Sequence, residues 1–144
     1  MPETDEIIQV VRQWVQKAEN DLKNAAFTLK LGAACPTDTV CFHAQQCVEK
    51  YLKALLVANK IDFARTHHIS ALLAFLPQTI RPDLTAEEQA LLTDYAVSTR
   101  YPGDYESILL SEARRAVQIA RRVRQQIRHW LPPAGMQPIK QTLR

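Results

Sequence analysis

Residues 40–58 read VCFHAQQCVEKYLKALLVA, and this stretch decides the fold. Apolar side chains recur in it at steps of three and four, the spacing of one face of an α-helix. The apolar positions are Val40, Cys41, Ala44, Cys47, Val48, Tyr51, Leu52, Leu55, Leu56 and Ala58. Such a wide stripe predicts a central helix packed on more than one side, which Thr37 or Asp38 caps and which reaches about Lys60.

Four further helices are expected around this central one. The same spacing over residues 4–31 and 105–131 predicts two more long helices, with Thr4 as the N-cap of the first and Gly32 as its stop. Shorter helices are expected over residues 69–76 and, after a capping-box pattern that begins at Thr85, to about Ser98. The sequence therefore predicts an all-α, up-and-down helical bundle of about five helices, three of them long, over residues 1–131. Residues 132–144 are expected to form a flexible tail.

Composition bounds the class of protein. The chain has 144 residues, of which 47% are hydrophobic and 23% charged, as in one folded domain. It contains no apolar run of the roughly 20 residues that a membrane-spanning helix needs, and its acidic N-terminus lacks the basic start of a signal peptide. Three cysteines exclude a complete internal disulfide framework. Together these features favour a cytoplasmic protein with reduced cysteines in its core.

Basic residues gather in the last helix. The net charge of +3 is too small to imply nucleic-acid binding by itself, but most of the basic excess follows Glu112. Arg114, Arg121 and Arg128 are seven residues apart and so share one helix face, which could meet an acidic protein partner or a nucleic-acid backbone. The alternative is a solvated face. Because interleaved aromatic residues are missing, we expect a protein partner rather than nucleic acid.

A polar line crosses the otherwise apolar central helix. It consists of His43, Gln46, Lys50 and Lys53, and it must face solvent, a partner or a groove. Lysines there could neutralise phosphate, and His43 could donate or accept a hydrogen bond. The alternative is a solvated face with pairs such as Glu49–Lys53.

Two adjacent histidines, His67 and His68, precede the short helix. One of them could cap that helix or project toward a pocket. No carboxylate–histidine pattern at metal-ligand spacing and no CxxC motif occurs, so we predict neither a metal site nor a cofactor.

Four strings, in this order and spacing, resemble the HEPN family of small helical domains. They are AENDLK at 18–23, HAQQCVEKYLKALL at 43–56, THHI at 66–69 and TRYPGDY at 99–105. The resemblance covers about residues 8–130. It implies a helical bundle that often dimerises. Many members are encoded beside, or fused to, a minimal nucleotidyltransferase, and other members are ribonucleases, including toxins.

The nuclease members carry an arginine followed, after four to six residues, by a histidine. Arg100 matches the arginine, but the three positions for the histidine hold Tyr105, Glu106 and Ser107. The chain therefore resembles the non-nuclease branch with an Arg-Tyr-Pro motif. The resemblance implies a nucleotide-binding or accessory module that partners a minimal nucleotidyltransferase in a two-component, toxin–antitoxin-like system. The alternative is a degenerate ribonuclease that uses Arg100 with His43 or His67.

The TRYPGDY segment is the leading candidate for ligand binding. The planar fork of Arg100 can grip phosphate, the helix start after Asp104 offers free N–H groups, and Tyr101 or Tyr105 could stack on a base. Alternatively, Arg100 pairs with Asp104 or Glu106 and only fixes the turn.

Three side chains of the polar line complete the expected site. A nucleotide phosphate is expected between Arg100 and the groove formed by His43, Lys50 and Lys53, with His67 nearby. No nucleotidyltransferase signature, a Gly-Ser turn followed by paired aspartates, occurs in the chain.

The first helix predicts self-association. Its apolar residues extend beyond a single stripe to Ile8, Val10, Val15, Ala26 and Phe27. A bundle of this size cannot easily cover all of them, and an exposed apolar patch usually marks an interface. We therefore expect a two-fold symmetric homodimer.

Overall fold

The computed structural model describes residues 2–96 and 107–139, and all regular structure in these two ranges is helical. The α-helices are α1 (Pro2–Leu29), α2 (Thr37–Ala58), α3 (Ile69–Phe75), α4 (Ala86–Ala96) and α5 (Leu110–Trp130). Three short 3₁₀ helices join them: η1 (Gly32–Ala34), η2 (Gln78–Ile80) and η3 (Pro133–Met136). The predicted all-α bundle of five helices, three of them long, is confirmed.

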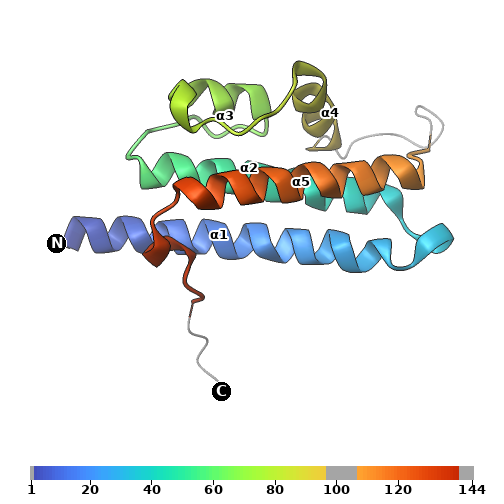
Figure 1. Cartoon of the computed structure of the whole chain (residues 1–144), viewed down its shortest axis with the longest axis horizontal. Helices are drawn as coiled ribbons and strands as arrows, with labels where there is room; N and C mark the ends of the chain where they lie inside the picture. Colours follow the sequence, from blue (N-terminus) through green and yellow to red (C-terminus); the bar gives the residue numbers. More distant parts are fainter. Residues whose placement is uncertain (1, 97–106, 140–144) are drawn as a thin grey trace.

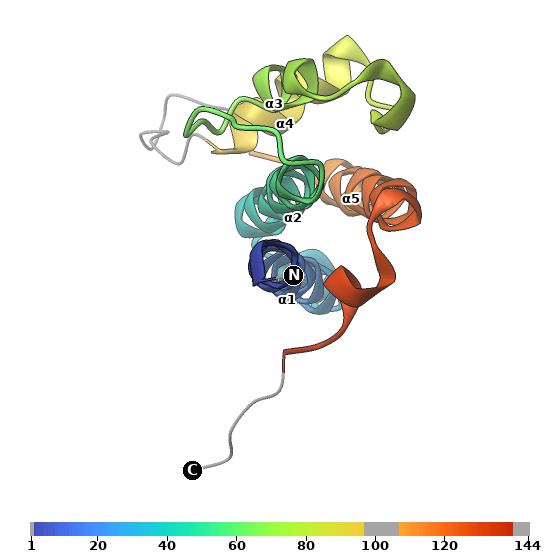
Figure 2. The ribbon, with the colours of Figure 1, turned by 90° about the vertical axis from the view of Figure 1, so that its left-hand side faces the viewer.

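The three long helices lie side by side, and α3 and α4 form a layer on one side of them (Figure 1). Viewed along the bundle, α2 lies between α1 and this layer (Figure 2). Helix α5 runs in the same direction as α2 and opposite to α1, because α3 and α4 return the chain to the end where α2 begins (Figure 1). There, the Thr37 hydroxyl donates a 2.7 Å hydrogen bond to the Ile108 carbonyl and ties the two starts together.

Helix α2 is the centre of the hydrophobic core, as its wide stripe predicted. Tyr51, Leu52, Leu55 and Leu56 are all fully buried. Burial of each such side chain stabilises the fold by roughly 1.5–3 kcal/mol. Because α2 is covered on two sides, its remaining polar side chains must find partners inside the bundle or at its edges.

Helix boundaries follow local signals, with three differences. At the start of α2, Pro36 occupies the N-cap position without a side-chain hydrogen bond, so neither Thr37 nor Asp38 caps this helix as expected. The capping box is present: the Thr85 N–H donates to Glu88 Oε1 (3.0 Å), and the Glu88 N–H donates to Thr85 Oγ1 (3.1 Å). Helix α1 begins at Pro2, upstream of the expected cap Thr4, since proline suits the first helical position. Helix α5 begins at Leu110 instead of near residue 105, because the preceding Leu109 is extended at ψ 151°.

The segment after α5 differs from the predicted free tail. Residues 133–136 form η3 and pack against α1, so the expectation of a flexible tail is wrong for this part. Gly135 is buried, and an added Cβ there would lie 2.7 Å from Val11 Cγ1. Arg12 Nε donates a 2.7 Å hydrogen bond to the Ala134 carbonyl. The lack of a side chain at Gly135 permits the close approach to Val11, and the Arg12 side chain supplies a hydrogen-bond donor to a backbone carbonyl of the turn.

Within the described ranges, no helix has a stretch long and apolar enough to span a membrane.

Candidate functional site

Two buried carboxylates bind the polar line of α2. The first is Asp21 of α1, which is 7% exposed. It accepts hydrogen bonds from His43 Nδ1 at 2.8 Å and from Lys50 Nζ at 2.5 Å. His43 and Lys50 lie seven residues apart on one face of α2, so both reach the same carboxylate of the neighbouring helix.

The second carboxylate is Glu49 of α2 itself, which is 3% exposed. It accepts hydrogen bonds from Gln45 Nε2 (2.9 Å), Lys53 Nζ (3.0 Å) and His67 Nδ1 (2.8 Å). Lys53 is itself buried, and its ammonium lies 5.4 Å from the centre of the Trp14 ring. The expected pair Glu49–Lys53 therefore forms, but inside the bundle rather than on a solvated face.

Glu49 remains ionised at neutral pH. Burial alone would raise its pKa, but the hydrogen bonds from Gln45, Lys53 and His67 together hold the pKa below the usual carboxyl value. The carboxylate therefore carries a full charge and neutralises Lys53.

In both His43 and His67, Nδ1 is the ring nitrogen that contacts a carboxylate. Since an ionised carboxylate only accepts, the hydrogen-bond network places the N–H of each ring at Nδ1 and leaves Nε2 available. The side chain of His67 is 70% exposed and that of His43 is 32% exposed. An imidazole fixed by a carboxylate can transfer a proton or donate to a phosphate through its second nitrogen.

The structure thus brings the predicted residues together in two groups. His43 and Lys50 meet at Asp21, and Lys53 and His67 meet at Glu49. Each lysine is paired with a carboxylate, so this line is not an open cationic surface. The remaining members of the expected ligand site, Arg100, Tyr101, Asp104 and Tyr105, lie outside the described residues.

The role of Asp21 was not found from the sequence. The signal is present, because Asp21 follows Ala18 by three residues and precedes Ala25 by four, a spacing that places it beside these buried positions on the core-facing side of α1. A polar residue at such a position must find a buried partner. Which residue of α2 it meets depends on how the two helices are aligned, which α1 alone does not determine.

The three arginines of the predicted face on α5 differ in exposure and in contacts. Arg114 and Arg121 are exposed. Arg128 is directed toward α1, where its Nη1 contacts Glu19 Oε1 at 3.2 Å and the Tyr51 hydroxyl at 3.3 Å. Arg124 binds both oxygens of Glu19 through Nε, at 2.9 and 3.0 Å. Partner binding by this face remains a prediction.

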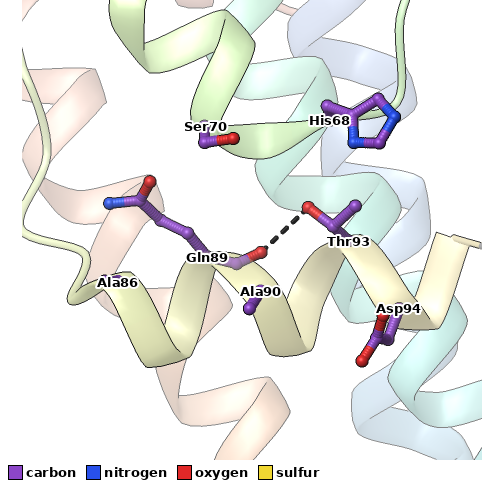
Figure 3. Close-up of a pocket in the computed structure, with 7 residues that line it drawn as sticks. All are labelled: His68, Ser70, Ala86, Gln89, Ala90, Thr93 and Asp94. Carbon is purple, nitrogen blue, oxygen red and sulfur yellow. Dashed lines mark hydrogen bonds between the residues drawn. The ribbon is translucent and has the colours of Figure 1, made fainter.

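His68 lines a shallow pocket between α3 and α4 rather than capping α3 through its side chain (Figure 3). The pocket has a volume of about 380 Å³, and Ser70, Gln89 and Asp94 also line it. Thr93 Oγ1 accepts a 3.3 Å hydrogen bond from the Ile69 N–H. It also donates one of 2.9 Å to the Gln89 carbonyl (Figure 3). The first of these bonds joins α3 to α4, and the second lies within α4.

Metal ligation gains no support from the described parts of the chain. No three His, Cys, Asp or Glu side chains converge there as metal ligands would. Cys41 and Cys47 are buried, and burial raises the pKa of the Cys41 thiol to about 12, so this thiol is not a nucleophile at neutral pH.

Comparison with known proteins identifies the class. The family model described as "HEPN domain" matches residues 11–130, and the chain therefore belongs to the HEPN domain family. A protein of Methanocaldococcus jannaschii named "Putative toxin MJ1304" is 32% identical over 106 residues, which are 68% of this chain and 67% of that protein.

Two solved structures share the fold. TT1696 from Thermus thermophilus is 30% identical, with a TM-score of 0.68 over 84% of this chain and 98% of that one. ST0689, an archaeal HEPN homologue, is 28% identical, with a TM-score of 0.64 over 83% of this chain and 96% of that one.

Proposed function

We propose that this protein is one component of a two-component, toxin–antitoxin-like system. In this role it is a HEPN module of the non-nuclease branch that associates with a separate minimal nucleotidyltransferase. The similarity to the protein named "Putative toxin MJ1304", over two thirds of both chains, is the observation that carries the proposal. The chain itself bears no nucleotidyltransferase signature, so in this proposal the partner is the transferase.

The module binds a nucleotide phosphate beside Arg100 in this proposal. Lys50 and Lys53 are already neutralised by Asp21 and Glu49, so they contribute little free positive charge. Arg100 therefore supplies the decisive cation, while the outward nitrogens of His43 and His67 supply hydrogen bonds to the ligand. This assignment makes binding depend on Arg100 far more than on the lysines.

Calorimetric titration of ATP, GTP and short oligonucleotides tests this dependence. Wild type should bind at least one of them below millimolar concentration. Loss of one charge-assisted contact, by Arg100→Ala, should weaken that binding at least about tenfold. Lys17→Ala, at an exposed position of α1, is the matched control and should bind as wild type does. Absence of binding, or equal binding by a folded Arg100→Ala variant, contradicts the proposal.

A ribonuclease is the second candidate function, and the orientation of the histidines favours it. His43 and His67 each hold Nδ1 against a carboxylate and keep Nε2 available for proton transfer. Cleavage of single-stranded RNA by the purified wild type, lost in both Arg100→Ala and a histidine variant such as His67→Ala, would establish it. An inactive wild type would leave the binding module as the function.

A further inference from the structure

A basic pocket lies in the groove between α1 and α5, where η3 folds against α1. Its volume is about 340 Å³, within the range of small-molecule sites. We call it the α1–α5 pocket. Its charged lining consists of Arg12, Glu19, Lys23, Arg124 and Arg128, and its neutral polar lining consists of Gln16, Asn20 and Gln137. None of these residues belongs to the expected site at Arg100.

Positive charge dominates this lining. Four cationic side chains face a single carboxylate, which leaves an excess of three positive charges. The carboxylate of Glu19 binds Arg124 through both oxygens and Arg128 through one. Glu19 therefore fixes two guanidinium groups in place while cancelling the charge of only one of them.

The three arginines of the pocket are held in position before any ligand arrives. Arg12 is fixed by the Ala134 carbonyl at 2.7 Å and by Gln137 Oε1 at 3.0 Å, both from the segment that folds over the pocket. Lys23 lies one turn beyond Glu19 on α1 and is exposed at the edge of the pocket. Because guanidinium groups held in this way lose little freedom on binding, the pocket is organised for a fixed anion.

An unpartnered acceptor also lines the pocket. Gln16 Oε1 is buried, and within the described residues it has no hydrogen-bond partner. A buried acceptor without a donor is costly, so this oxygen favours a ligand that brings a hydroxyl or N–H group. Val15 and Met136 add apolar wall beside it. The ligand should therefore combine an anionic group with a second part that carries a hydrogen-bond donor.

We propose that the α1–α5 pocket binds a phosphate monoester whose body carries a hydroxyl group, the chemistry of a nucleoside monophosphate. Arginine forks match the oxygens of phosphate, and a monoester with nearly two negative charges suits an excess of three positive charges better than a single carboxylate does. No residue that lines this pocket belongs to the nucleotide site of the proposed function.

Titration calorimetry with AMP, inorganic phosphate and adenosine tests the proposal on the full chain. Wild type should bind AMP more tightly than inorganic phosphate and should not bind adenosine. Lys23→Glu, which reverses one charge at the exposed edge, should weaken AMP binding at least about tenfold. Lys17→Glu makes the same change on α1 outside the pocket and should leave AMP binding nearly unchanged. A thermal melt of each variant confirms that it is folded.

The two sites are distinguished by a second pair of titrations. AMP binding at the α1–α5 pocket should survive Arg100→Ala. If AMP binding is lost in Arg100→Ala and kept in Lys23→Glu, the nucleotide belongs to the other site and the inference is overturned. The absence of AMP binding below millimolar concentration also overturns the inference. If inorganic phosphate binds as tightly as AMP, the nucleoside part of the ligand makes no contribution and that part of the inference is overturned.

Discussion

Replacing Glu49 by glutamine should destabilise the fold far more than the same change at an exposed glutamate. Glu49→Gln leaves the buried ammonium of Lys53 facing a neutral amide. Removing one partner of a buried ion pair costs about 3–5 kcal/mol. Because the ring of His67 is 70% exposed, its contact adds little. We therefore expect the lower value, about 3 kcal/mol.

Urea unfolding followed by circular dichroism at pH 7 measures this loss. With a slope in the usual range of about 1–3 kcal/mol per molar, the midpoint should fall by at least about 1 M. Glu87→Gln is the control, since the Glu87 side chain is 79% exposed and lies 3.8 Å from Arg115. Such exposed pairs contribute about 0–1 kcal/mol. Equal shifts in the two variants, with unchanged slopes, would refute the role assigned to Glu49.

The difference in stability between wild type and Glu49→Gln should depend on pH. The pKa of Glu49 lies below its ordinary value of 4.5 in the fold, so the folded state favours the ionised form. Its contribution to the free energy of unfolding is present above pH 4.5 and is lost as the pH falls through the folded-state pKa. The stability difference between wild type and Glu49→Gln should therefore shrink on acidification below that pH.

Three further outcomes are expected. Gly135→Ala should lower the free energy of unfolding by about 1–3 kcal/mol in a urea titration, because its Cβ would lie 2.7 Å from Val11 Cγ1; an unchanged midpoint would mean that η3 does not pack there. Light scattering well above micromolar concentration should give the mass of a dimer, and Phe27→Asp, at a side chain that is 67% exposed, should shift it toward a monomer; a monomeric wild type would count against the expected interface. Purified protein should leave single-stranded RNA and tRNA intact, and metal-independent cleavage that disappears in Arg100→Ala would reverse this expectation.

The sequence was sufficient to predict the helices but not the polar contacts between them. The stripe through Tyr51 and Leu55 predicted a central helix, and the Thr85 capping box predicted the start of α4, because both signals are local. The pairing of His43 with Asp21 joins residues 22 positions apart and depends on how α1 and α2 align. Local spacing carries no information on that alignment.

The packing of η3 was missed for a similar reason. Proline, glycine and glutamine are common in free tails, and composition alone gave that expectation for residues 132–144. Gly135 instead allows the backbone to approach Val11, and Arg12 donates to the Ala134 carbonyl. These contacts span more than 120 residues of chain and appear only once α1 and α5 are placed together.

The central claim is that this HEPN protein is one component of a two-component, toxin–antitoxin-like system and acts together with a minimal nucleotidyltransferase. The most direct measurement is a count of colony-forming cells after induction in a bacterial host, with the wild-type chain alone and together with a minimal nucleotidyltransferase from the same genome. The account predicts that the chain alone reduces the count and that the nucleotidyltransferase restores it, while Arg100→Ala at equal soluble amount has little effect. A wild-type chain that leaves the count at the level of the empty vector, at the same soluble amount, would contradict the account.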